Sequence, residues 1–101
     1  MKPEPVHVKA YLEDLIPLFM AKRQEDAAAW AEALARGDLP ALGAIGHRMK
    51  GTCASYGFKA LTETGRELED LARAGALEQA AALLDGFRAY LASVRIVVVP
   101  D

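Results

Sequence analysis

One histidine in the middle of an apolar periodic stretch has the setting of an exposed nucleophile. Leu42, Ile45, Met49 and Cys53 recur at three- and four-residue spacing, which predicts the core-facing side of a helix. At about 100° per residue, His47 lies roughly 140° from Leu42 and faces solvent. A neutral imidazole, whose unperturbed pKa is about 6.5, keeps a lone pair on one nitrogen near pH 7. We therefore expect His47 to react as a nucleophile toward a substrate with a good leaving group.

Glycines surround this histidine on its own helix, although each glycine costs about 1 kcal/mol relative to alanine in a helix interior. Gly46 lies nearer the core stripe, where it can let a neighbouring helix approach. Gly43 and Gly51 lie four residues before and after His47. We interpret both as steric clearance for a group that must come close to the imidazole.

Two charged residues are candidates to assist the imidazole. Lys50 lies one turn along the same face, where its ammonium could neutralise a phosphoryl group; the alternative is an ordinary surface lysine. Glu69 lies on the next predicted helix, one turn beyond Gly65, and could accept a hydrogen bond from one ring N–H. Its alternative is a solvent-facing glutamate among other acidic residues.

The charge pattern favours an acidic partner protein. No Asp or Glu occurs from residue 39 to residue 62, whereas Arg48, Lys50 and Lys59 lie there, in a chain of net charge −2. A local positive field would speed encounter with an acidic surface. The overall acidity argues against a nucleic-acid binder.

Length and composition indicate one small helical domain. The chain has 101 residues, of which 52 % are hydrophobic, enough for a single core. It shows no run of 18 apolar residues and no signal-peptide pattern at the amino terminus, so we expect no membrane association and a cytoplasmic location. Cys53 is the only cysteine, and its position near the core stripe predicts a buried thiol.

Periodicity and helix-ending residues predict four long helices. Because Pro17 interrupts the apolar pattern, we expect either a short helix over residues 8–15 and a long one over 17–36, or one helix that is kinked at Pro17. The others run over about 39–56, from near 58 to Gly75, and from near 77 to about 95, with Gly37, Gly57 and Gly75 as stops. Trp30, by its spacing, belongs to the core.

Short connections between long helices predict an all-α, antiparallel, up-down-up-down four-helix bundle, capped by the short amino-terminal helix. We divide the chain into a loose lead-in at residues 1–7, the domain at 8–95 and a tail at 96–101. His7, alone in the lead-in, has no second ligand at metal-binding spacing. The β-branched tail fits a frayed helix end, a packed tail or a weak association surface.

The histidine stretch also has the pattern of a known family. Its sequence is His47-Arg48-Met49-Lys50-Gly51-Thr52-Cys53, followed by Tyr56-Gly57. It resembles the His-x-hydrophobic-Lys-Gly-small-small signature of histidine phosphotransfer (HPt) domains. The resemblance extends from about residue 11 to about residue 94 and includes Leu68-Glu69; Met49 stands where leucine is common, a volume-conserving difference.

The resemblance implies a phosphoryl carrier that is not an enzyme with kinase activity of its own. A phosphoaspartate on a receiver domain would phosphorylate Nε2 of His47, and the phosphoryl group would pass to an aspartate of a second receiver. The partners implied are receiver domains of hybrid histidine kinases and of response regulators. No cofactor is expected on this chain, because the receivers supply the Mg²⁺. A nucleotide-binding fingerprint is absent from the sequence, and a bundle with its own core is expected to be a monomer.

Three other kinds of protein or site share parts of this pattern. A receiver-binding interaction module without phosphotransfer would have no need of His47, Lys50 and Gly51 together. The dimerisation helix pair of a sensor kinase usually has an acidic residue after its histidine, where this chain has Arg48. A metal or haem site at His47 lacks a second ligand at i+3 or i+4.

Overall fold

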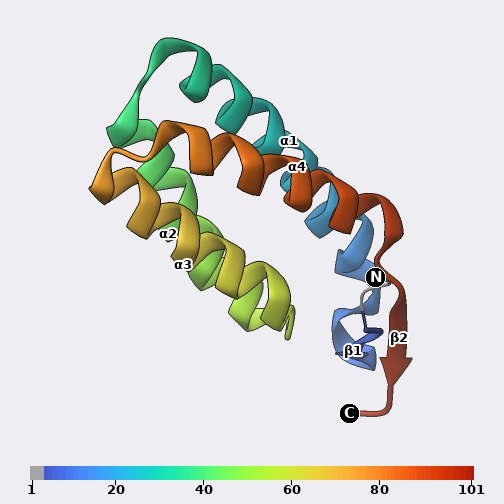
Figure 1. Cartoon of the computed structure of the whole chain (residues 1–101). Helices are drawn as coiled ribbons and strands as arrows, with labels where there is room; N and C mark the ends of the chain where they lie inside the picture. The colour runs from blue at the N-terminus through green and yellow to red at the C-terminus, as the bar shows by residue number, and fades with distance from the viewer. Residues whose placement is uncertain (1–3) are drawn as a thin grey trace.

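Four long helices pack as an antiparallel bundle, which confirms the predicted fold class (Figure 1). The computed structural model describes residues 4–101. The helices are α1 (Ile16–Arg36), α2 (Leu39–Ser55), α3 (Lys59–Ala74) and α4 (Leu77–Ser93). Each packs against two neighbours, so that α1 lies between α2 and α4, and α3 lies between the same two helices. The ends agree with the predicted ends to within one or two residues.

Local chemistry explains where the helices begin and end. Asp38 caps α2 by accepting a hydrogen bond from the Ala41 N–H at 3.0 Å, a contact worth about 1 kcal/mol. Pro17 lies in the first turn of α1, where a missing N–H costs nothing. Gly37, Gly57 and Gly75 follow α1, α2 and α3 with φ between 64° and 82°, the left-handed conformation that only glycine adopts without strain.

The core runs along the middle of the bundle. Trp30 is fully buried, as predicted, and its Nε1–H donates to the Ala80 carbonyl at 3.1 Å, which ties α1 to α4. The large apolar side chains that are almost completely buried with it are Phe58, Phe87, Leu42, Met49, Leu61, Leu68 and Val8. Cys53 is also fully buried, as predicted.

The amino-terminal segment differs from the prediction. In place of a helix over residues 8–15, a strand β1 (Val6–Lys9) is followed by a 3-10 helix η1 (Ala10–Leu15). The lead-in is not wholly loose, because Val6 and His7 belong to β1; residues 1–3 of that lead-in lie outside the described residues. Val6 and Val8 point into the core while His7 and Lys9 are exposed, which is the alternation of a strand rather than a helix.

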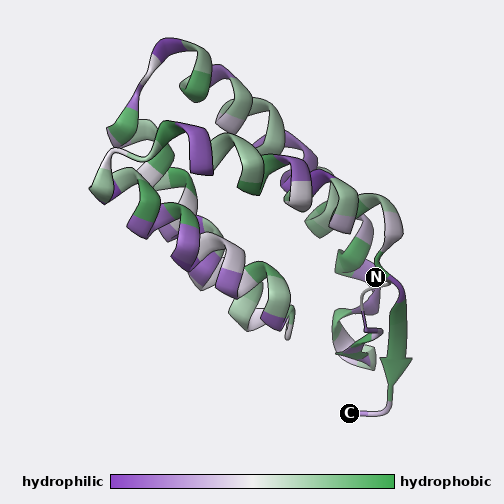
Figure 2. Cartoon of the chain, in the orientation of Figure 1, coloured by the Kyte–Doolittle hydropathy of each residue, from purple (hydrophilic) through white to green (hydrophobic). Residues whose placement is uncertain are grey.

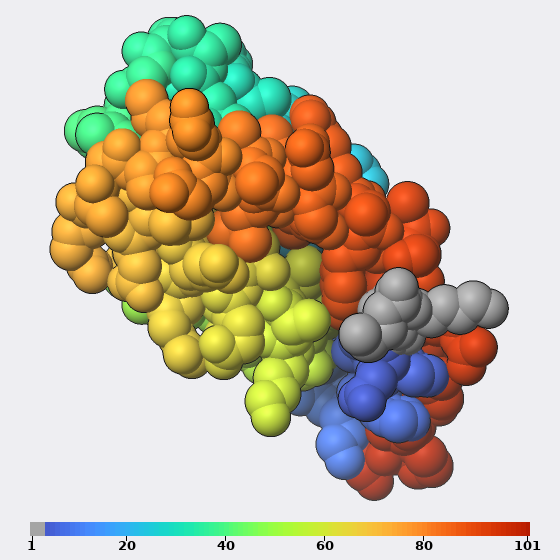
Figure 3. Space-filling model, in the orientation of Figure 1, coloured from blue at the N-terminus to red at the C-terminus, as the bar shows by residue number. Residues whose placement is uncertain are grey.

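The tail is a packed strand. Ile96–Val99 forms β2, which pairs in parallel with β1 in the register Val6 to Ile96. The two ends of the chain thus lie side by side at one end of the bundle, where the blue and red surfaces touch (Figure 3). β2 is hydrophobic along its whole length (Figure 2). Local periodicity missed this pair because its strands are almost 90 residues apart in the sequence.

Candidate functional site

His47 projects from the middle of α2, where its side chain is 73 % exposed. The buried residues of α2 lie on the other side of the helix and include Leu42, Ile45 and Met49, as the periodicity predicted. The imidazole is therefore held by a rigid helix whose opposite face is fixed in the core. This supporting helix keeps the imidazole ring in one place without covering it.

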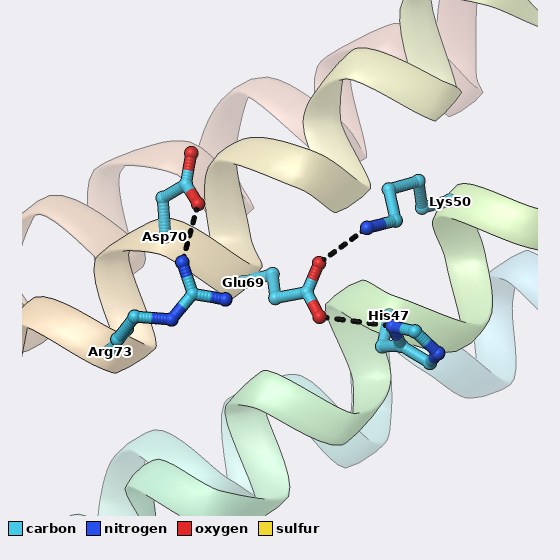
Figure 4. Close-up of polar contacts among 5 residues, drawn as sticks. All are labelled: His47, Lys50, Glu69, Asp70 and Arg73. Atoms are coloured by element: carbon cyan, nitrogen blue, oxygen red, sulfur yellow. Dashed lines mark hydrogen bonds and ion pairs between the residues drawn. The ribbon is translucent and has the colours of Figure 1, made fainter.

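The carboxylate of Glu69 joins His47 and Lys50 (Figure 4). Its Oε2 lies 3.0 Å from His47 Nδ1, and its Oε1 accepts from Lys50 Nζ at 2.8 Å. The Glu69 side chain is only 18 % exposed, whereas that of Lys50 is 38 % exposed. Two helices thus bring together the three charged or titratable residues that the sequence singled out.

The contact between Glu69 and His47 determines which nitrogen of the neutral ring carries the hydrogen. An ionised carboxylate only accepts hydrogen bonds, so the hydrogen of a neutral imidazole must be on Nδ1. The lone pair is then on Nε2, the nitrogen farther from Glu69. The pKa of Glu69 is lowered from its ordinary value of 4.5, chiefly by the hydrogen bond from Lys50 and also by that from His47, against an opposing effect of desolvation. Glu69 therefore remains a carboxylate near neutral pH.

A close crossing of α2 and α3 places Glu69 beside His47. A Cβ added at Gly46 would lie 2.6 Å from the Gly65 carbonyl oxygen and 2.7 Å from the Glu69 backbone nitrogen. A Cβ added at Gly65 would lie 2.8 Å from the Gly46 carbonyl oxygen. Both distances are too short for real atoms, so only glycine at both positions allows this approach. The interpretation of Gly46 as a residue that lets a neighbouring helix approach is confirmed, and Gly65 is the residue of α3 that it meets.

The two glycines beside His47 have different surroundings. A Cβ at Gly51 would meet nothing within 4 Å, so the space above this residue is open. A Cβ at Gly43 would meet Ala72 Cβ of α3 at 3.6 Å, because Gly43 faces the α2–α3 contact. The interpretation of Gly43 as clearance for an approaching group is therefore wrong, and that of Gly51 stays a prediction.

A second polar network, on α1, was missed from the sequence. Arg23 donates from Nε to Asp26 Oδ2 at 2.8 Å, and Arg48 donates from Nη2 to Asp26 Oδ1 at 2.9 Å. Arg23 and Asp26 are each only 4 % exposed. Arg23 also donates from Nη1 to Cys53 Sγ at 3.8 Å. Arg23 lowers the pKa of the Cys53 thiol, but burial has the larger effect and raises that pKa to about 11. The available signal was an Arg–Asp pair at i,i+3 within an apolar stripe.

The positive patch on α2 is partly neutralised by these contacts. Arg48 pairs with Asp26 and Lys50 pairs with Glu69, so two of the three cations counted between residues 39 and 62 have acidic partners on neighbouring helices. Lys59 is exposed at the start of α3. Because those partners lie far away in the sequence, the run without Asp or Glu overstated the field around His47.

Two kinds of feature are absent from residues 4–101. No group of three or more His, Cys, Asp or Glu side chains is arranged to hold a metal ion there. None of the helices in this part of the chain combines the length and apolar character needed to cross a membrane.

Comparison with known proteins identifies the family. No curated protein and no solved structure matches the chain. The family model described as "Hpt domain" matches residues 14–96, which include all four helices from α1 to α4. The strand β1, most of η1 and all of β2 except Ile96 lie outside the match. Since this match covers most of the sequence and includes His47, Lys50 and Glu69, the chain belongs to the Hpt domain family, whose members have a histidine phosphotransfer role in phosphorelays.

Proposed function

We propose that His47 is the phosphorylated residue of this chain and relays a phosphoryl group between the aspartates of two receiver domains. The observation that carries the proposal is that the His47 side chain is 73 % exposed while its Nδ1 lies 3.0 Å from Glu69 Oε2. This contact holds the proton on Nδ1 and leaves the Nε2 lone pair available to a partner protein.

The reaction needs no base from this chain. The Nε2 lone pair attacks phosphorus of a receiver's aspartyl phosphate, the bond from phosphorus to the aspartate oxygen breaks, and the carboxylate leaves as an anion. The Nδ1 proton stays on the ring, which then carries the phosphoryl group as an imidazolium. Glu69 opposes that positive charge at 3.0 Å. In the second transfer a carboxylate of another receiver attacks phosphorus, and Nε2 recovers its lone pair.

Lys50 and Gly51 complete the proposed site. The Lys50 ammonium, held at 2.8 Å by Glu69, supplies positive charge one turn from His47 for the incoming phosphoryl oxygens. Gly51 leaves open space beside the ring through which a receiver's aspartate can approach. The Mg²⁺ required in both transfers is assigned to the receivers, and no cofactor is assigned to this chain.

The carrier role excludes kinase activity of its own in this proposal, since Hpt domains carry phosphoryl groups rather than draw them from ATP. The proposed partners are receiver domains of hybrid histidine kinases and of response regulators. We propose a cytoplasmic monomer, because receivers act there and the bundle buries its own core. A receiver-binding module without transfer is the alternative, and the Glu69–His47 contact gives no advantage to such a module.

The test is transfer of labelled phosphate. Receiver domains of the source organism are loaded with ³²P-acetyl phosphate and Mg²⁺, then mixed with the native chain, with His47→Gln or with His7→Gln. His7 is the other histidine of the chain and is exposed on β1. We expect acid-labile label on the native chain and on His7→Gln, and none on His47→Gln. A native chain that binds a receiver but stays unlabelled would favour the interaction module.

A further inference from the structure

The β1–β2 sheet has a free edge that the proposed transfer chemistry does not use. β2 (Ile96–Val99) pairs with β1 on one side only. In Figure 1, β1 and η1 lie to the left of the β2 arrow, and no element of residues 4–101 lies to its right in this view. The free edge is therefore the side of β2 that faces away from β1.

The hydrogen bonding of the sheet identifies the backbone groups on this edge. The Val6 N–H donates to the Arg95 carbonyl at 2.8 Å, so the carbonyl of Arg95 faces β1. Backbone groups of successive residues in a strand point alternately to its two sides. The N–H and C=O groups of Ile96 and Val98 therefore point away from β1. Unpaired donors and acceptors in this position are a template for another strand.

The side chains of β2 leave this edge open. Val97 is 39 % exposed and Val98 is 38 % exposed. Sheet edges are commonly guarded by a lysine, a proline or a bulge, whereas residues 96–99 contain no charged residue and no proline. The strand is only four residues long, which limits it to a small interface. We therefore expect a weak and reversible association at this edge.

The two ends of β2 carry opposite charges. Arg95 precedes the strand and is exposed, and the exposed Asp101 follows it. Asp101 Oδ1 accepts from the Tyr11 N–H at 2.9 Å, which leaves Oδ2 able to accept from another group. In a second copy that runs antiparallel, the acidic end lies beside the basic end of the first copy. β2 is thus complementary in charge to itself, which favours a second copy of this chain over an unrelated strand as the partner.

We propose that two copies of this chain associate through antiparallel pairing of their β2 strands, with Ile96 of each copy opposite Val98 of the other. This register uses residues of β2 alone, and each Ile96–Val98 pair exchanges both backbone hydrogen bonds. Val97 of one copy then lies opposite Val97 of the other. Arg95 lies diagonally across from Asp101 of the other copy, within reach of a long side chain.

The composition of the chain limits both the register and the strength of this pairing. In the next register, Ile96 would lie opposite Pro100, which has no N–H to donate. Because the bundle buries its own core, the folded monomer needs no partner and stays the main form at low concentration. The inference does not rest on the transfer chemistry, since none of the pairing residues lies in α2 or α3, which carry His47 and Glu69.

Sedimentation equilibrium of the full chain between about 1 μM and 1 mM measures the association. We expect a reversible shift from monomer to dimer, and the same shift for His47→Gln. Val98→Pro removes an N–H that faces away from β1, so it should keep the fold, checked by circular dichroism, and stay monomeric throughout. Val98→Thr keeps both the N–H and the side-chain shape, and as the matched control it should still dimerise.

A disulfide crosslink tests the register. Directly opposite residues of a non-hydrogen-bonded pair have Cα atoms about 4.5 Å apart, within disulfide range, whereas diagonal neighbours are about 7–8 Å apart. Val97→Cys should therefore form a covalent dimer under mild oxidation, and Val98→Cys should not. The native Cys53 is buried, so the native chain is the uncrosslinked control.

A charge exchange tests the complementarity of the two ends. Arg95→Asp and Asp101→Arg each bring like charges together at both ends of the dimer, and each should raise the dissociation constant by about tenfold. An equimolar mixture of these two variants restores opposite charges in the mixed dimer. It should associate as tightly as the native chain.

Three results would overturn the proposal. A native chain that stays monomeric at the highest concentration has no such interface, and a dimer that persists in Val98→Pro forms through another surface. A crosslink through Val98→Cys in place of Val97→Cys excludes the register. A charge mixture that associates no better than its components excludes the antiparallel orientation. Labelling of His47 is measured separately, so each of these results leaves the proposed function standing.

Discussion

Gly46 of α2 and Gly65 of α3 face each other so closely that a Cβ on either residue would lie within 2.8 Å of the other's carbonyl oxygen. This crossing brings the Glu69 backbone next to the helix that carries His47. The separation of the two helices therefore determines whether Glu69 can reach both His47 and Lys50. The position of a functional carboxylate depends here on two residues that have no side chain.

Gly65→Ala is expected to lower the free energy of unfolding by about 1–3 kcal/mol, because the added methyl forces α2 and α3 apart. Urea denaturation measures this change. Gly86→Ala is the matched control, since a Cβ at Gly86 of α4 meets nothing within 4 Å. It should raise stability by about 0.5–1 kcal/mol through helix propensity alone. Equal effects of the two substitutions would contradict the close crossing.

Glu69→Gln is expected to make stability less sensitive to acid. The pKa of Glu69 is lowered in the folded protein, so its carboxylate stabilises the fold above the ordinary value of 4.5 and this contribution disappears as the pH falls through the lowered pKa. The native chain should therefore lose more stability than Glu69→Gln between pH 7 and pH 3. Glu67→Gln, an exposed neighbour on α3, should follow the native pH dependence.

The contact between Glu69 and His47 also predicts the tautomer of the His47 ring. ¹⁵N NMR of the native chain above pH 7 should show His47 as the tautomer with hydrogen on Nδ1, because Glu69 accepts there. Glu69→Ala should give a mixture of the two tautomers and slower phosphoryl transfer. A native spectrum with the hydrogen on Nε2 would contradict the proposed orientation of the ring.

Asp26→Ala is expected to destabilise the protein by about 3 kcal/mol or more, because it leaves the Arg23 guanidinium buried without its carboxylate. Thermal and urea unfolding measure the change. Replacing both members, Arg23→Met with Asp26→Leu, should recover much of the loss. Asp70→Ala removes an exposed i,i+3 partner of Arg73 and should change stability by about 0.5 kcal/mol or less. A small effect of Asp26→Ala would mean that the pair is hydrated in solution.

The pairing of the chain ends predicts a contrast between two valines. Val8 of β1 is completely buried, whereas Val97 of β2 is 39 % exposed. Val8→Ala should lower the free energy of unfolding by about 2 kcal/mol, and Val97→Ala by about 0.5 kcal/mol or less. Deleting residues 96–101 should destabilise more than either substitution, because it removes the partner of β1. Equal effects of the two alanine substitutions would mean that β1 is not packed on the bundle.

The sequence by itself determined the four helices, their ends and the exposed side of α2. These features depend on interactions within a few residues: apolar spacing, a capping aspartate and glycines that adopt positive φ. The exposed position of His47 followed from the same periodicity. The closeness of Gly46 and Gly65 was also predictable, because glycine among large apolar residues is costly in a helix unless another backbone approaches it.

Only the tertiary structure decided which charged residues meet. Glu69 was left open between orienting His47 and facing solvent, since its reach depends on the separation and rotation of α2 and α3. The Asp26–Arg48 contact and the β1–β2 pair join residues 22 and about 90 positions apart. Such contacts depend on how whole elements pack, and a pattern that spans a few residues carries no information about that packing.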